Sequence, residues 1–193
     1  MTAHFLTPPH HPGQAYDLPH EAPIAGTELE TMLGSLERQR AIFAWKCGGL
    51  DSAGLQKSHP PSTMTLGGLM KHLALCEDEY FSHRLLGTEL GAPWDAVDWD
   101  ADSEWEWHSA TDDTAEEIYE LWNAAADRSR AAVASVLPDG GLDHLAQYKN
   151  SRGETPTLRR LLIDLIEEYA RHAGHADLIR EAVDGLTGEE PPR

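Results

Sequence analysis

A glutamate and a histidine stand four positions apart near the carboxyl end of the chain, at Glu168 and His172. In a helix, residues at this spacing project from the same face, one turn apart. This face is also apolar, and a carboxylate in an apolar stripe is costly unless it is paired or binds a metal. Helices present metal ligands at this spacing, so both residues are candidate ligands.

One helix supplies only two donors here, so a metal site needs a third from another helix. His72 borders an apolar stripe in a separate helical segment and is the natural candidate. The pattern also permits a plainer interpretation, in which Glu168 and His172 form an ion pair that stabilises the helix by about 0.2–0.5 kcal/mol. His175 lies roughly 10 Å from Glu168 along the helix axis. We therefore expect His175 to contact a ligand rather than the ion.

The spacing of apolar residues predicts four amphipathic helices and no convincing strands. The first begins at Thr27, where Thr27 and Glu30 have the spacing of a capping box, and ends at Gly48. The others cover about residues 66–86, 114–136 and 157–184, and the third starts with a second capping box. Four such helices favour an all-α bundle.

The remaining segments complete the expected organisation. Residues 1–26 hold several prolines and four histidines and are predicted to be a flexible arm, residues 27–188 the bundle, and residues 189–193 a short tail. Residues 50–64 are an expected loop. Residues 88–112 form a longer, acidic loop with four tryptophans, and we expect it to cover a cleft beside the site.

Charge and cysteine content narrow the possible partners and compartments. The net charge of −18 disfavours nucleic acid and anionic membrane surfaces, and the chain has no apolar run long enough to span a membrane. The first residues lack the features of a secretory signal. Cys47 and Cys76 form no CxxC motif, so we expect reduced thiols in a cytoplasmic protein, with Cys76 packed in the core.

Two stretches resemble the second and fourth helices of DinB-like bundle proteins: TLGGLMKHLA from Thr65, with Glu77 following, and EYARHAGHAD from Glu168. The chain is similar to an actinobacterial branch of unknown function, related to the mycothiol-dependent maleylpyruvate isomerases. The resemblance implies a DinB-like four-helix bundle with a long loop between helices 2 and 3. It also implies metal ligands at His72, Glu168 and His172, because mycothiol-dependent members have a glutamate first on the fourth helix where many others have a histidine.

Three protein ligands on zinc leave an open position, which is typical of a catalytic site. Such a site can hold a thiol as the nucleophilic thiolate. The resulting hypothesis is a metal-dependent, zinc-containing thiol S-transferase or isomerase, with mycothiol as the thiol that the resemblance implies and a small-molecule electrophile as its partner. The chain would act as a monomer or homodimer.

Two alternatives remain open from the sequence. The first is a hydrolase that activates metal-bound water, for which Glu77 or His175 would be the candidate general base. The second is a non-enzymatic metal-binding bundle protein, which an exposed apolar face would favour. The sequence does not indicate which residues are catalytic or which electrophile is the substrate.

Overall fold

The computed structural model describes residues 22–188, so most of the expected arm and all of the expected tail lie outside the described residues. Within 22–188 there is no strand, only isolated bridges between Ser58 and Thr65 and between Leu145 and Thr157. The all-α class predicted from the sequence is confirmed. The helices are α1 (Glu28–Cys47), α2 (Ser52–Leu55), α3 (Leu66–Glu77), the π-helix η1 (Asp78–Leu85), the 3₁₀ turn η2 (Trp94–Ala96), α4 (Trp105–Ser109), α5 (Ala115–Val136), the 3₁₀ turn η3 (Gly141–Asp143) and α6 (Leu158–Asp184).

The long helices begin where the sequence predicts. The Thr27 hydroxyl accepts from the Glu30 amide while the Glu30 carboxylate accepts from the Thr27 amide, which satisfies two donors that the first turn of α1 leaves unpaired. Thr114 and Glu117 form the same reciprocal cap on α5. Helices α3 and α6 each follow a single threonine cap. Both predicted capping boxes are therefore confirmed.

The expected helix over residues 66–86 changes its pitch halfway. It is α-helical to Glu77 and continues as the π-helix η1 from Asp78 to Leu85. At this junction the Ser129 hydroxyl donates to the Glu77 carbonyl at 3.1 Å, and the buried Asp78 carboxylate accepts from Arg128 and from Trp94. A π-turn inside a helix often accompanies such local demands, and hydrophobic periodicity does not predict it.

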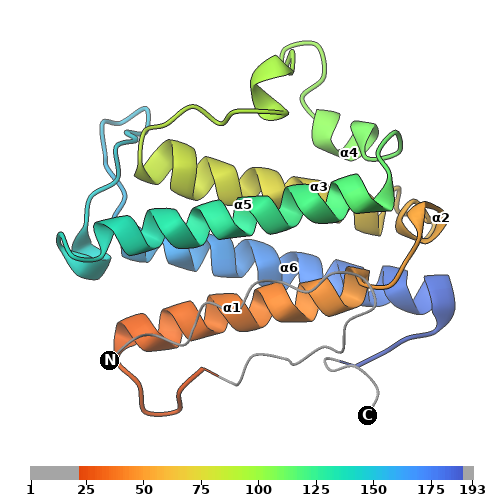
Figure 1. Ribbon diagram of the computed structural model, residues 1–193, viewed down its shortest axis with the longest axis horizontal. Helices are drawn as coiled ribbons and strands as arrows, with labels where there is room; N and C mark the ends of the chain where they lie inside the picture. The colour runs from red at the N-terminus through yellow and green to blue at the C-terminus, as the bar shows by residue number, and fades with distance from the viewer. Residues whose placement is uncertain (1–21, 189–193) are drawn as a thin grey trace.

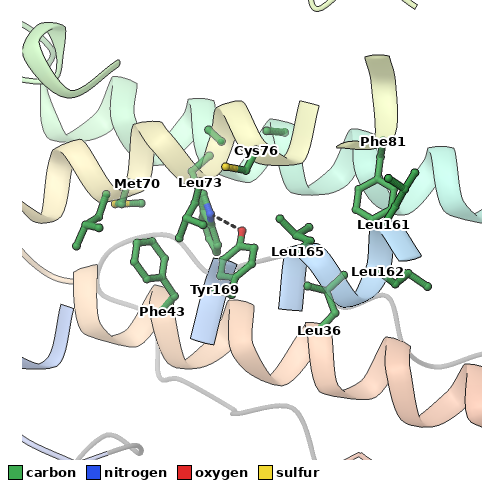
Figure 2. Packing of buried hydrophobic residues seen from close by; sticks show 14 of the residues in the cluster. Leu36, Phe43, Met70, Leu73, Cys76, Phe81, Leu161, Leu162, Leu165 and Tyr169 are labelled. Carbon is green, nitrogen blue, oxygen red and sulfur yellow. Dashed lines mark hydrogen bonds between the residues drawn. The ribbon is translucent and has the colours of Figure 1, made fainter. Parts of the chain in front are cut away.

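Two pairs of long helices enclose the core. Helix α1 packs along α6, and α5 packs along α3 and η1 (Figure 1). Helix α3 also packs against α6, so the two helices that carry the candidate ligands are neighbours. Figure 2 shows Phe43, Leu73, Leu165 and Tyr169 converging between α1, α3 and α6. Within residues 22–188, no helix combines the length and apolarity that a membrane span requires.

Two segments expected to be loops contain short α-helices, so the described chain has six α-helices where four were predicted. Helix α2 lies within residues 50–64, and α4 lies within residues 88–112. Helix α4 is tied to α3, because Lys71 places its ammonium 4.3 Å from the ring centre of Trp105 and 2.5 Å from the Asp113 carboxylate. Tertiary contacts, rather than helical periodicity, stabilise a helix this short.

Candidate metal centre

The structure brings together the three residues that the sequence proposes as metal ligands. His72 comes from α3, and Glu168 and His172 from α6. One donor atom of each lies within 4.8 Å of the other two. Glu168 Oε2 is 3.4 Å from His172 Nε2, and the two imidazole rings meet edge to face with their centres 5.0 Å apart.

The three candidate donors are partly buried to different degrees. The side chain of His172 is 8% exposed, that of His72 21% and that of Glu168 32%. The exposed fraction of the side chain therefore increases from His172 to His72 to Glu168. Glu168 is thus the most exposed of the three candidate donors.

Both histidines have a hydrogen-bond partner on Nδ1. His72 Nδ1 lies 3.1 Å from Glu106 Oε1, and His172 Nδ1 lies 3.2 Å from His175 Nδ1. A neutral imidazole that donates through Nδ1 keeps its lone pair on Nε2. In that tautomer both Nε2 atoms would be available as metal donors, and His175 contacts the candidate ligand His172.

The electrostatic surroundings keep His172 neutral. Burial lowers the pKa of His172 to about 4, and the nearby imidazoles of His72 and His175 act in the same direction. Metal binding requires an unprotonated imidazole, so His172 does not have to release a proton before it binds a metal near neutral pH.

Cys76 lies beside this group without joining it. Its Sγ is 3.6 Å from His72 Nε2, and its side chain belongs to the hydrophobic core, as expected. Burial first, and the Glu168 carboxylate second, raise the pKa of the Cys76 thiol well above its ordinary value. A thiol held protonated in this way is a poor nucleophile.

The tryptophan-rich segment covers the His72 side of the centre. The Trp107 ring stacks on His72 with ring centres 4.6 Å apart and planes at 24°. Gly68, one turn before His72, leaves room for it, because a Cβ there would lie 3.1 Å from Trp107 Cε3. Of the segment 88–112, Trp107 therefore lies directly against the candidate ligand His72.

Sequence reasoning missed Glu106. This segment holds so many acidic residues that none stands out by type. Its position between Trp105 and Trp107 was the available signal, because a carboxylate flanked by two large apolar side chains is a candidate for burial. In the structure the residue is 5% exposed.

Glu77, one of the two candidate general bases, is fully engaged elsewhere. It is 0% exposed, and its carboxylate accepts from Arg40 Nε and Nη2 at 2.7 and 2.6 Å and from the Tyr169 hydroxyl at 2.7 Å. These three hydrogen bonds hold the Glu77 carboxylate in its buried position. Glu77 therefore links α1, α3 and α6 through its contacts with Arg40 and Tyr169.

A family model described as mycothiol-S-transferase matches residues 31–185. The chain belongs to the mycothiol-S-transferase family. The resemblance to mycothiol-related DinB-like proteins is thereby confirmed. No curated protein and no solved structure matches the chain. The region of the chain matched by the family model includes the three candidate ligands, His72, Glu168 and His172, and also Glu106.

The donors present in this mycothiol-S-transferase family member fit a divalent ion. Two imidazole nitrogens and one carboxylate oxygen are donors that zinc accepts, and donors about 2.1 Å from a tetrahedral ion lie roughly 3.4 Å apart. The separation between Glu168 Oε2 and His172 Nε2 is 3.4 Å, and all three donors lie within 4.8 Å of one another. Glu106 Oε2 is buried without a hydrogen-bond partner within residues 22–188. A cation on the other side of His72 would compensate that buried charge.

Proposed function

We propose that this protein is a metal-dependent thiol S-transferase or isomerase, with zinc as the ion. It would use a low-molecular-weight thiol, mycothiol, to attack a small electrophile. The proposal includes a DinB-like four-helix arrangement of residues 27–188, formed by α1, α3 with η1, α5 and α6. His72, Glu168 and His172 would hold the ion.

The observation that carries the proposal is the convergence of these three donors within 4.8 Å, in a chain that matches the mycothiol-S-transferase model over residues 31–185. A simple ion pair between Glu168 and His172 requires a protonated imidazole, whereas the low pKa of His172 favours the neutral form. A third donor from a different helix is also unnecessary for an i, i+4 pair. Both facts favour a role for Glu168 and His172 as metal ligands over a simple ion pair.

When bound, the ion supplies positive charge that lowers the pKa of a thiol and favours the thiolate at neutral pH. Neutral His72 and His172 leave that charge undiminished, while the Glu168 carboxylate offsets one unit of it and helps to retain the cation. Trp107 shields the His72 side from water. In the transfer step the thiol loses its proton, sulfur forms a bond to the electrophilic carbon, and either a leaving group departs or a neighbouring atom takes up a proton.

The two alternatives have less support. Of the two candidate bases for water activation, Glu77 is bound to Arg40 and Tyr169 instead. The other, His175, has its Nδ1 atom 3.2 Å from Nδ1 of His172. A non-enzymatic role would be favoured by an exposed apolar helix face. Among residues 22–188, only two large exposed apolar residues lie on a helix, Ile163 and Leu178 on α6; the others lie outside the helices and are Ile24, Leu86, Leu145 and Tyr148.

A conjugation assay tests the proposal. Zinc-loaded protein is mixed with a fluorogenic haloalkyl probe and, in separate reactions, with mycothiol, glutathione or cysteine. We expect catalysed adduct formation with mycothiol, its loss after chelation and its return with zinc. Equal rates with and without protein for every thiol would contradict the transferase assignment.

A further inference from the structure

Glu106 is a buried carboxylate that the proposed ligand set does not include. Its side chain comes from α4, and Oε1 lies 3.1 Å from Nδ1 of His72. Its second oxygen, Oε2, is buried and has no hydrogen-bond partner in the part of the chain that the structure describes. A carboxylate placed in this way is expensive to bury and therefore requires an explanation.

Local packing holds Glu106 against His72. The next residue, Trp107, stacks on the His72 ring, and the preceding one, Trp105, lies under the Lys71 ammonium. Lys71 directly precedes His72 on α3, so α4 is attached to α3 on both sides of the contact. Side chains of α4 thus contact both the face of the His72 ring and its Nδ1 atom.

We propose that Glu106 is a positioning residue for the metal centre: it accepts the Nδ1 proton of His72, which leaves the Nε2 lone pair directed at the ion. This inference rests on the proposed function, because it assigns Glu106 a role toward the same site. The carboxylate also makes His72 a stronger donor, since its negative charge is felt through the imidazole. In turn, a cation on Nε2 compensates the buried charge of Glu106.

A purely structural role makes a different prediction. If Glu106 served only to attach α4, its replacement would destabilise the protein whether or not metal is present. If it positions His72, removal of its charge weakens metal binding and spares the metal-free fold, because a neutral amide costs less to bury than a carboxylate with an unpartnered oxygen. The metal-free melting temperature and the metal affinity therefore separate the two roles.

The test compares Glu106→Gln with Glu104→Gln. Glu104 lies on the same segment, its side chain is 71% exposed, and its substitution makes the same change in charge. Zinc affinity is measured by competition with a chelating dye, and the melting temperature of each metal-free variant is recorded. For Glu106→Gln we expect roughly a 10- to 100-fold loss of zinc affinity and no fall in melting temperature. Affinity equal to that of Glu104→Gln, or a loss matched by a less stable metal-free fold, would overturn the inference.

A second measurement needs no metal. Nitrogen-15 NMR of the metal-free wild type reports which ring nitrogen of His72 carries the proton, and we expect Nδ1. A proton on Nε2 would contradict the inference. A wild-type protein that binds no zinc would instead contradict the proposed function, while the NMR result would still report on the Glu106 contact.

Discussion

Tyr169 on α6 donates a 2.7 Å hydrogen bond to the buried carboxylate of Glu77 on α3. Tyr169 directly follows the candidate ligand Glu168, so the bond joins the two ligand-bearing helices close to the site. Trp122 of α5 donates to the same tyrosine hydroxyl at 2.8 Å, and Arg40 of α1 binds Glu77 through two nitrogens. One buried polar network therefore sets the relative position of α3 and α6.

Substitution of Glu77 should destabilise the fold. Glu77→Gln leaves the Arg40 guanidinium buried without its full counter-charge, and breaking a buried pair from one side costs about 3–5 kcal/mol. We expect a loss of this size in the free energy of unfolding from denaturant titration. The matched control is Glu79→Gln, because the Glu79 side chain is 37% exposed in its pair with Arg84 and such pairs contribute below about 1 kcal/mol.

The same variant also tests the alternative role of Glu77. If Glu77 were a general base, Glu77→Gln would fold as stably as Glu79→Gln and would lose activity alone. That outcome would contradict the structural assignment of Glu77.

Substitution of either candidate histidine ligand should remove the bound metal. We expect about one divalent ion per chain in the wild type, and its loss in His72→Ala and in His172→Ala. His108→Ala serves as the control, because His108 is 63% exposed, pairs with Asp102 and is not one of the three clustered donors. Elemental analysis of the purified proteins makes the measurement. Full metal content in both site variants would rule out this site.

Trp107 should report metal binding by fluorescence. Its ring stacks on His72, so an ion on that histidine changes the electrostatic surroundings of the indole. We expect zinc addition to alter the emission of the wild type and of Trp99→Phe, and the change to disappear in Trp107→Phe. A change that persists in Trp107→Phe would show that Trp107 does not border the ion.

Much of the fold follows from local sequence features. The capping threonines Thr27 and Thr114 stand next to the segments that they start, and apolar spacing marks the long helices. The spacing of Glu168 and His172 likewise places both on one face of α6. Such features require only neighbouring residues, so sequence alone is sufficient to predict them.

The contacts that complete the site depend on tertiary packing. Glu106 and His72 are 34 positions apart, and no local pattern links them. The burial of Glu77 in a network with Arg40 and Tyr169 also follows from how α1, α3 and α6 meet. The short α4 forms because its side chains pack on α3, which neither its length nor its periodicity indicates.

Zinc titration of Glu168→Gln tests the central claim most directly. The substitution keeps the shape of the side chain and removes the charge that a metal ligand supplies. Glu167→Gln is the control, because Glu167 is the exposed neighbour on α6 and its substitution makes the same change in charge. We predict that Glu168→Gln binds zinc much more weakly and loses thiol transfer, as His172→Ala should, while Glu167→Gln behaves as the wild type. Unaltered zinc affinity in Glu168→Gln would contradict the account.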